Sequence, residues 1–346
     1  MLAGGLLPVP SSWALPTREL RFPRDHGSHP DLRTEWWYAT GHAESADGAR
    51  YGFQLTFFRS RVEGTQSLTS AFAARQLLFA HAALTDLQAG QLHHDQRIAR
   101  AGFGIADASE EDTRVRLRDW SLMRDPSSGA YMAEAPGADF GLSLRLQPTQ
   151  PVLLQGQAGL SRKGPDPAQA SYYYSQPQLA VEGRVAVAGR PPQPVRGRAW
   201  LDHEWSQALL HPEAVGWDWV GMNLEDGSAL TAFRLRRANG SALWAGGSWR
   251  PPGGAMQVFD HDSVHFEPLR FWTSPLSRAR YPVQWRIRTP AGSFEVRALV
   301  DNQELDSRAS TGAIYWEGLS ALLDTSGRQA GRGYLEMTGY AQALKL

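Results

Sequence analysis

The sequence predicts an all-β protein made of two related antiparallel β-barrels. Helical signals are weak, because 34 glycines and 22 prolines recur every few residues and few windows keep an apolar period of 3.6 residues. Short aromatic and β-branched runs instead alternate with turn residues, which is typical of antiparallel strands. Elements of the first half recur in the second half, which indicates an internal duplication.

The first half begins with a predicted hairpin. Residues 35–42 and 51–59 are the two strands, and Ala46-Asp47-Gly48 is the turn, because an Asp-Gly pair between apolar runs favours a hairpin. Residues 65–75 are predicted as a short helix or a loop. Further strands are predicted at residues 77–87, 113–123, 140–146, 152–160 and, as the closing strand, 197–206.

The second half repeats this pattern after His211-Pro212. A strand, an Asp226-Gly227 turn and a strand come first. The predicted strands are 217–224, 228–235, 242–249, 264–272, 283–288, 293–300, 314–323 and 331–342.

Three matches in the same order support the duplication. The opening hairpins match, Trp37…Asp47-Gly48…Phe57 with Trp219…Asp226-Gly227…Phe233. An aromatic cluster follows in each half, Tyr172-Tyr173-Tyr174 in the first and Tyr315-Trp316 in the second. The closing strands also match, Arg198-Ala199-Trp200-Leu201-Asp202 with Arg332-Gly333-Tyr334-Leu335-Glu336. We therefore predict one barrel over residues 17–206 and a second over residues 207–346. Closing a sheet removes its edges and can leave a ligand cavity inside it.

Composition excludes several classes of protein. The chain has 35 basic and 35 acidic residues, and a formal net charge of zero argues against a nucleic-acid partner. It has no cysteine, so disulfides, thiol nucleophiles and cysteine-type zinc sites are excluded. No apolar run reaches about 18 residues, so no membrane-spanning helix is expected.

The N-terminus suggests export. Residues 1–16 are apolar and small, and Ser12-Trp13-Ala14 is similar to a signal-peptidase site, although a basic region before it is missing. We expect the remnant of an export signal and a periplasmic or secreted protein. The alternative is a disordered N-terminus on a protein that stays in the cytoplasm.

The closing strand of the first half has the densest chemistry. Alternate side chains of a strand share a face, so Trp200, Asp202 and Glu204 are predicted on one face, and Leu201, His203 and Trp205 on the other. Two carboxylates and an imidazole among indoles are suited to acid–base chemistry. The alternative is a structural network in which Arg198 pairs with the acids between the barrels.

Two other acids lie beside indoles. Glu35 precedes Trp36-Trp37, and Asp218 lies between Trp217 and Trp219. A carboxyl group in an apolar pocket has a raised pKa and can act as a general acid. For Glu35 the alternative is a salt bridge to an arginine such as Arg33.

Seven blocks along nearly the whole chain carry a family resemblance. They are EWWYATGH (35–42), YGFQLTFFR (51–59), LLFAHAALTD (77–86), GRAWLDHEWS (197–206), GWDWVGMNLEDGSALTAFRLR (216–236), YWEG (315–318) and GRGYLEMTGY (331–340). In these blocks the chain resembles the lipocalin-like proteins grouped with carotenoid 1,2-hydratase and the bacterial AttH proteins. The resemblance implies two packed lipocalin-like barrels, no cofactor and frequent export. The family includes a hydratase that adds water to a terminal carotenoid double bond.

Two functions are consistent with this resemblance. In the first, the protein is a hydratase-like enzyme for an isoprenoid or polyene-like molecule, in which Asp202 and His203 move protons with Glu204, and Glu35 or Asp218 assists. In the second, it is an exported, non-catalytic protein that binds a lipid-like ligand, linked to envelope transport or attachment. The side chains expected to hold the ligand are Trp36, Trp37, Tyr38, Trp200, Trp205, Trp217, Trp219, Tyr315 and Trp316.

The histidines do not indicate a metal site. His93-His94 is expected in a polar turn, and His261 and His265 would be too far apart on a strand to share one ion. Neither a phosphate loop nor a dinucleotide fingerprint is found at a strand–helix junction, so we predict neither a metal nor a cofactor.

Overall fold

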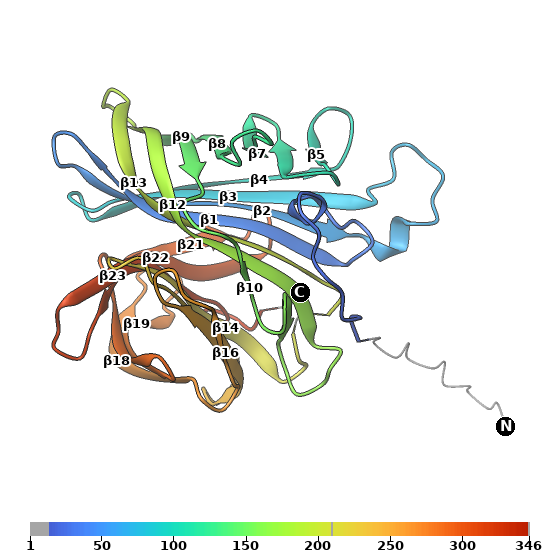
Figure 1. Cartoon of the computed structure of the whole chain (residues 1–346). Coiled ribbons are helices and arrows are strands. Elements are labelled where there is room, and N and C mark those ends of the chain that lie inside the picture. Colours follow the sequence, from blue (N-terminus) through green and yellow to red (C-terminus); the bar gives the residue numbers. More distant parts are fainter. Residues whose placement is uncertain (1–13, 209, 345–346) are drawn as a thin grey trace.

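A computed structural model of the chain describes residues 14–208 and 210–344. These residues form two antiparallel sheets (Figure 1), and their helical content is limited to the single 3-10 turns η1 (Arg24–His26) and η2 (Glu63–Thr65). The expected all-β fold is therefore confirmed. No helix in the described ranges has the length and apolar character needed to cross a membrane. Residues 1–13, which hold most of the predicted export signal, lie outside the described ranges.

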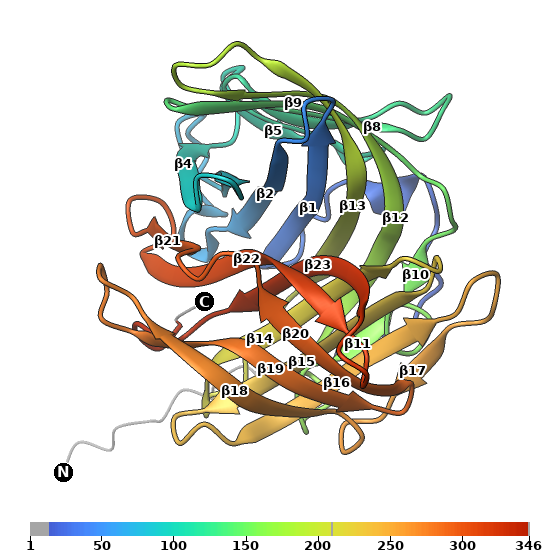
Figure 2. The same cartoon turned by 90° about the vertical axis from the view of Figure 1, so that its left-hand side faces the viewer.

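Thirteen strands form sheet A, which curls into a nearly closed barrel, barrel A (Figure 2). They are β1 (Thr34–Ser45), β2 (Arg50–Arg61), β3 (Gln76–Asp86), β4 (Gln91–Arg100), β5 (Ala106–Ala108), β6 (Arg114–Leu117), β7 (Trp120–Arg124), β8 (Tyr131–Pro136), β9 (Phe140–Gln147), β10 (Leu153–Leu154), β11 (Leu160–Arg162), β12 (Ala170–Val187) and β13 (Gln193–Ser206). Their order is β4-β3-β2-β1-β13-β12-β9-β8-β7-β6-β5, and β10 and β11 pair with β12.

Ten strands form sheet B, the sheet of barrel B. They are β14 (Ala214–Leu224), β15 (Ala229–Arg237), β16 (Ala242–Arg250), β17 (Gln257–Phe259), β18 (His265–Thr273), β19 (Arg280–Thr289), β20 (Gly292–Ala298), β21 (Glu304–Ser307), β22 (Ala313–Leu323) and β23 (Gln329–Met337). Their order is β17-β16-β15-β14-β23-β22-β20-β19-β18, and β21 pairs with β22.

The two sheets have the same topology. In each sheet the first strand pairs with the last, β1 with β13 and β14 with β23, and short strands pair separately with the penultimate strand: β10 and β11 with β12, and β21 with β22. This correspondence is what a duplicated unit produces. The chain leaves sheet A at Ser206 and enters sheet B at Ala214. The domain limits at residues 206 and 207 stay a prediction.

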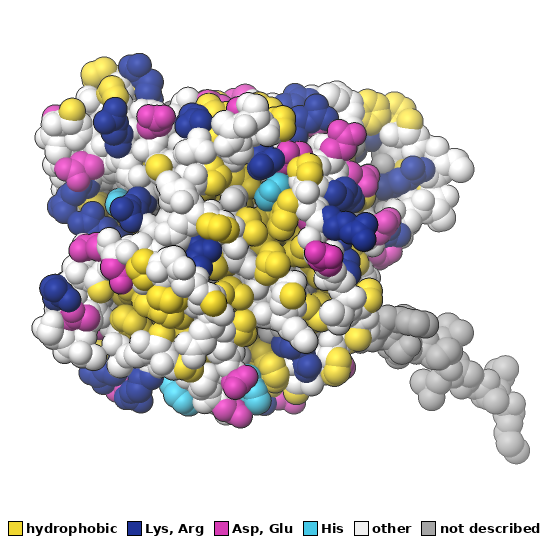
Figure 3. All heavy atoms as spheres, in the orientation of Figure 1, with side chains coloured by type: hydrophobic (Ala, Val, Ile, Leu, Met, Phe, Trp, Pro, Cys, Tyr) yellow, Lys and Arg dark blue, Asp and Glu magenta, His cyan; other side chains and the backbone are white. Residues whose placement is uncertain are grey.

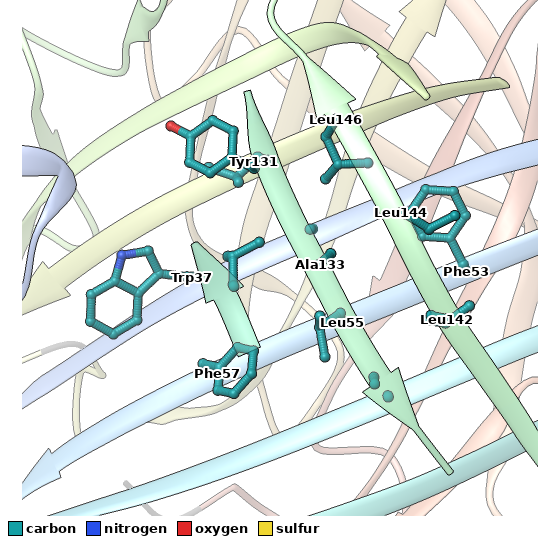
Figure 4. Close-up of a cluster of buried hydrophobic side chains, with 14 of the residues drawn as sticks. Trp37, Phe53, Leu55, Phe57, Tyr131, Ala133, Leu142, Leu144 and Leu146 are labelled. Atoms are coloured by element: carbon teal, nitrogen blue, oxygen red, sulfur yellow. The ribbon is translucent and has the colours of Figure 1, made fainter. Parts of the chain in front are cut away.

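The interior of barrel A is filled by side chains. Figure 4 shows Trp37, Phe53 and Phe57 pointing from β1 and β2 toward Tyr131 and Leu144 of β8 and β9, and all five belong to one buried cluster. Barrel B has its own apolar cluster, which includes Val220, Trp285 and Trp316. A closed sheet can enclose a ligand cavity, but here the apolar side chains of these two clusters occupy the interiors of barrel A and barrel B.

The outer faces of the two barrels pack against each other along a seam. A third buried cluster contains Tyr38 and Trp200 from sheet A with Trp219, Leu319 and Tyr334 from sheet B. In the surface view, hydrophobic side chains gather along this seam (Figure 3). A bulge of β12 adds polar contacts across the seam, because the backbone N–H of Gln178 donates to Asn223 Oδ1 at 2.7 Å.

Some predicted elements differ from the structure. Residues 113–123 form β6 and β7 rather than one strand, since the chain turns at Arg118 with φ of 58°. Residues 152–160 form only β10 and the first residue of β11, because Gly156 and Gly159 turn the chain with positive φ. Strands β4, β8 and β12 were not predicted, and His93-His94 lies in β4 rather than in a turn.

We predict that Gly52→Val loosens the seam. A Cβ at Gly52 of β2 would lie 2.9 Å from Leu319 Cβ and 3.0 Å from the Tyr334 hydroxyl of barrel B. Forcing a larger side chain into this contact is expected to lower the free energy of unfolding by about 1–3 kcal/mol, measured by urea denaturation. The control is Gly141→Ala, whose Cβ would lie 3.6 Å from Ala186 Cβ. An equal loss in both variants would contradict the packing account.

Candidate functional site

A cavity of about 350 Å³ lies between the two barrels. Sheet A lines it with residues of β1, β2, β3, β12 and β13, and sheet B with residues of β14, β15, β22 and β23. The lining includes Trp36, Tyr38, Phe58, Tyr173, Asp202 and Glu204 from sheet A, and Trp217, Trp219, Phe233, Tyr315, Glu317 and Glu336 from sheet B. The wall thus combines aromatic side chains with five acidic residues, of which Glu35 is the fifth.

Besides Glu35, four acidic residues line the cavity, two from each half of the chain. Asp202 and Glu204 alternate along β13 and therefore share a face. Glu317 and Glu336 lie directly opposite each other on β22 and β23. Asp202 pairs with Tyr38 in the strand register, as Glu336 pairs with Trp219. Asp202 and Glu336 are therefore equivalent positions of the duplicated unit.

Asp202 accepts hydrogen bonds from three side chains. Tyr173 Oη donates to Oδ2 at 2.8 Å, and Trp200 Nε1 and Ser175 Oγ donate to Oδ1 at 2.7 and 2.5 Å. Burial raises the pKa of Asp202 to about 7, although these three donors oppose the rise. Asp202 is thus a carboxyl group that exchanges its proton near neutral pH while its donors hold it in place.

Glu204 forms an ion pair. Lys163 Nζ lies 3.0 Å from Glu204 Oε1, and both side chains are nearly inaccessible to solvent. The ammonium group also lies over the rings of Tyr173 and Phe233, 4.6 and 4.4 Å from their centroids. Ser171 donates a further hydrogen bond to Glu204. Glu204 is therefore held by a fixed cation, unlike the other three carboxyl groups.

Glu317 and Glu336 form a buried pair. Burial and the neighbouring Glu336 raise the pKa of Glu317 well above its usual value. Burial raises the pKa of Glu336 to about 7, against the opposing effect of the Trp217 indole. Two adjacent buried carboxyl groups do not both ionise readily, so the pair retains a proton at neutral pH.

The environment of Glu317 suits a neutral acid. Its Oε1 atom and the hydroxyl of Tyr38 are buried without a hydrogen-bond partner of good geometry among the described residues. The two groups are nevertheless close enough for Glu317 to raise the pKa of the Tyr38 hydroxyl, after burial itself. Within the described ranges no cation comparable to Lys163 is paired with Glu317, which lines the cavity.

His203 does not face this cavity. Asp202 and His203 were predicted to act together, but alternation along β13 places His203 on the inner face of barrel A, stacked on Trp37. Burial lowers the pKa of His203 to about 4. Asp202 and His203 therefore cannot exchange protons with the same substrate atom, because their side chains lie on opposite faces of β13.

Glu35 belongs to the same inner network. It accepts hydrogen bonds from Arg59 Nε at 2.8 Å, His203 Nε2 at 2.9 Å, His29 Nδ1 at 2.8 Å and Ser28 Oγ at 2.9 Å. Burial would raise its pKa, but the bonds from His203 and His29 outweigh burial and hold the pKa well below its usual value. The prediction of a raised pKa is wrong, and the ion-pair alternative holds with Arg59 as the arginine.

His29, Glu35 and His203 are close enough to hold a metal ion. Their ligand atoms lie within 4.8 Å of one another. The Glu35 oxygen facing both imidazoles is already hydrogen-bonded to them, and the Arg59 guanidinium adds a positive charge to the same carboxylate. Because a cation would have to displace these donors beside a fixed positive charge, we assign this cluster a structural role.

Asp218 and three indoles also lie away from the cavity. Asp218 forms an ion pair with Arg234 at 2.7 Å and accepts a hydrogen bond from the Tyr340 hydroxyl at 2.8 Å. Trp37 and Trp205 fill barrel A, and Trp316 fills barrel B. Strand alternation explains each case, since the neighbouring residues Trp36, Glu204, Trp217 and Glu317 face the cavity.

The remaining predicted residues are close to the cavity. Trp36, Tyr38, Trp217, Trp219, Tyr315, Asp202 and Glu204 line it, and so does Glu35, whose carboxylate is bound in the network with Arg59. Trp200 packs in the seam and donates to Asp202. Glu317, Glu336, Tyr173 and Lys163 were missed. The duplication contained the signal for Glu336, because it matches Asp202 in the closing strand, and Glu317 lies within the block YWEG.

Comparison with known proteins gives a consistent assignment of the fold. The model of a family described as AttH-like matches residues 13–340. A putative AttH from Nitrosomonas europaea has 47% identity and a TM-score of 0.88, over 94% of this chain and 99% of that chain. Kievitone hydratase from Nectria haematococca has 14% identity and a TM-score of 0.72, over 94% of each chain. CghA bound to Sch210972 has 14% identity and a TM-score of 0.55, over 88% of each chain. No curated protein matches the sequence.

We predict that Glu35→Gln destabilises the protein strongly at neutral pH. Removing the carboxylate leaves the buried Arg59 guanidinium without its ion pair, which is expected to cost about 3–5 kcal/mol in the free energy of unfolding, measured by urea denaturation. The control is Glu182→Gln, which breaks a pair with Arg145 whose carboxylate is 60% exposed, at an expected cost of about 0–1 kcal/mol.

The difference between wild type and Glu35→Gln should also depend on pH. The pKa of Glu35 is lowered in the folded state, so its contribution is present above the unfolded value of about 4.5 and is lost as the pH falls through the folded value. A difference that stays constant down to pH 3 would contradict the role of Glu35 as a charged centre.

Proposed function

The chain belongs to the AttH-like family, and from this premise we propose that it catalyses addition of water to a carbon–carbon double bond of a hydrophobic, isoprenoid or polyene-like molecule. Kievitone hydratase, which shares the fold, is named for a hydration. The observation that carries the proposal is the carboxyl cluster in the aromatic cavity, whose wall contains both Glu317, with a pKa raised by burial and Glu336, and the hydrogen-bonded Asp202.

Glu317 is the proton donor in this proposal. Hydration of an alkene begins when an acid transfers a proton to the less substituted carbon, which leaves a cation on the more substituted carbon. A carboxyl group can do this only while it is neutral at the working pH, and the pKa of Glu317 is raised well above its usual value by burial and by Glu336. No hydrogen bond of good geometry occupies its Oε1 atom, although the nearby Tyr38 hydroxyl partly opposes the rise in pKa.

Asp202 is the base that activates water. A water molecule attacks the cation, and Asp202 takes the proton that this water loses, so one water is added in total. A pKa of about 7 is well placed for a general base at neutral pH. Glu317 then regains a proton from solvent as Asp202 releases one, which restores both groups for the next cycle.

The aromatic wall has two roles in this scheme. Trp36, Trp219 and Phe233 supply apolar surface that holds a hydrocarbon chain. Indole and phenyl faces also attract a positive charge, by about 0.5–2 kcal/mol per contact, which favours the cationic intermediate. The reaction requires an acid, a base and water, and side chains of this protein supply the first two without a cofactor.

Export of the protein and its catalytic activity are two separate proposals. We retain export to the periplasm or the medium as a proposal that rests on the apolar residues 1–16. The alternative function is ligand binding without turnover in the same cavity. Turnover measurements on variants of the carboxyl cluster separate the two functions.

We predict that Glu317→Gln lowers kcat by about 100- to 10,000-fold with little change in ligand binding. Incorporation of ¹⁸O from labelled water into kievitone and into an acyclic isoprenoid would be followed by mass spectrometry, and binding by quenching of tryptophan fluorescence. The control is Glu304→Gln, a buried carboxyl of barrel B that hydrogen-bonds Tyr281 and does not line the cavity. Binding without ¹⁸O incorporation by the wild type would favour the non-catalytic alternative.

We predict a bell-shaped pH dependence of kcat/KM. The rate should rise as Asp202 loses its proton near pH 7, and fall once Glu317 ionises, because the scheme needs a neutral Glu317 and burial together with Glu336 raises its pKa well above the usual value. Asp202→Asn should remove the rising limb and lower the rate. Retention of the rising limb in this variant would show that another group acts as the base.

A further inference from the structure

Several exposed hydrophobic side chains gather at one end of barrel A. Five of the twelve large exposed hydrophobic residues in the described ranges lie in the β2–β3 loop (residues 62–75), at the end of β4 or in the β4–β5 loop (residues 101–105). Four of them form what we call the apolar tip: Leu68, Phe72, Phe103 and Ile105, which are 47%, 72%, 55% and 44% exposed. The β2–β3 loop projects from the body of the molecule in Figure 1.

The apolar tip is held in a defined arrangement. The rings of Phe72 and Phe103 stack with their centroids 5.5 Å apart, which joins the two loops. The guanidinium group of Arg100 lies 4.2 Å from the Phe103 centroid and donates to the Phe72 carbonyl at 2.8 Å. Arg75 donates to the Leu68 carbonyl at 2.5 Å. Two aromatic rings are thus displayed to solvent by contacts that fix their position.

The tip carries positive charge. Arg75 and Arg100 donate to backbone carbonyls, and neither forms an ion pair with a carboxylate in the part of the chain that the structure describes. Two arginines beside exposed aromatic and aliphatic side chains are a combination typical of segments that insert into the headgroup region of an anionic membrane.

A stripe of side chains connects the tip with the cavity. Phe58 and Phe79 pair across β2 and β3 and both line the cavity. Along the same face, Phe79 pairs with Ile98, and Leu77 pairs with Arg100, which contacts the tip. Because alternate residues of a strand share a face, Leu77 and Phe79 continue one surface from the cavity toward the loops.

From these contacts we propose that the apolar tip docks on a lipid bilayer that contains anionic lipid, with the stripe as the path between bilayer and cavity. The bilayer is favoured over a protein partner because the exposed rings are flanked by unneutralised arginines and lead to an apolar cavity. The inference goes beyond the proposed hydration, since docking needs only the tip and would equally serve a protein that binds without turnover.

The test is sedimentation of the full chain with phosphatidylcholine vesicles with and without phosphatidylglycerol. We expect binding to the anionic vesicles, and at least a tenfold loss of affinity in the double variant Phe72→Ser/Phe103→Ser. Leu276→Ser is the matched control, because Leu276 is 59% exposed in the β18–β19 loop of barrel B and lies outside the tip. Arg75→Gln/Arg100→Gln should weaken binding to anionic vesicles much more than to neutral ones.

Several outcomes would overturn docking. They are no sedimentation of the wild type with anionic vesicles, equal binding by the double phenylalanine variant, or conversion of a dimer to a monomer by that variant without vesicle binding, which would identify an interface between copies. Circular dichroism checks that the variants are folded. Hydration of a detergent-solubilised isoprenoid should be unchanged in the phenylalanine variant, so loss of docking and failure of the proposed function are distinguishable.

Discussion

Alternation of side chains along the two closing strands determines which residues fill each barrel and which face the other barrel. On β13 and β23, one face fills a barrel with residues such as Leu201 and Leu335, and the other face presents Asp202 and Glu336 to the neighbouring barrel. Both barrel interiors are packed, and the cavity lies where the outer faces meet. The duplication thus creates a site that neither half possesses alone, since each half contributes acids and aromatic residues to one cavity.

The protein contains two kinds of buried carboxyl group. Glu35 lies inside barrel A with a hydrogen-bond donor on every side, and this arrangement keeps it ionised. Glu317 lies at the seam beside another acid, and burial keeps it neutral. Burying an incompletely paired carboxyl group costs stability, and a group perturbed in this way beside a cavity is a candidate for a functional role. The same side-chain type has a lowered pKa in one place and a raised pKa in the other because its neighbours differ.

Local pattern predicted some parts of the fold better than others. Strands with clear alternation and Asp-Gly turns, such as β1, β2, β14 and β15, were located closely. Strand β12 was missed because Pro177 interrupts it at a bulge. The sequence match of Trp37 with Trp219 pairs residues on opposite faces of their sheets, since Trp37 faces the barrel interior and Trp219 faces the cavity. The match of Trp200-Leu201-Asp202 with Tyr334-Leu335-Glu336 pairs residues on the same face, since Asp202 and Glu336 both line the cavity.

The sequence by itself determined the all-β class, the duplicated architecture and the alternation that separates Asp202 from His203 on β13. It could do so because strand periodicity and turn chemistry are local properties of the chain. Only the tertiary structure decided where the cavity lies, that Glu317 and Glu336 share it with Asp202, and that Glu35 is paired with Arg59. These facts depend on contacts between strands remote in the chain, and burial and neighbouring charges, which set each pKa, exist only once the barrels have packed together.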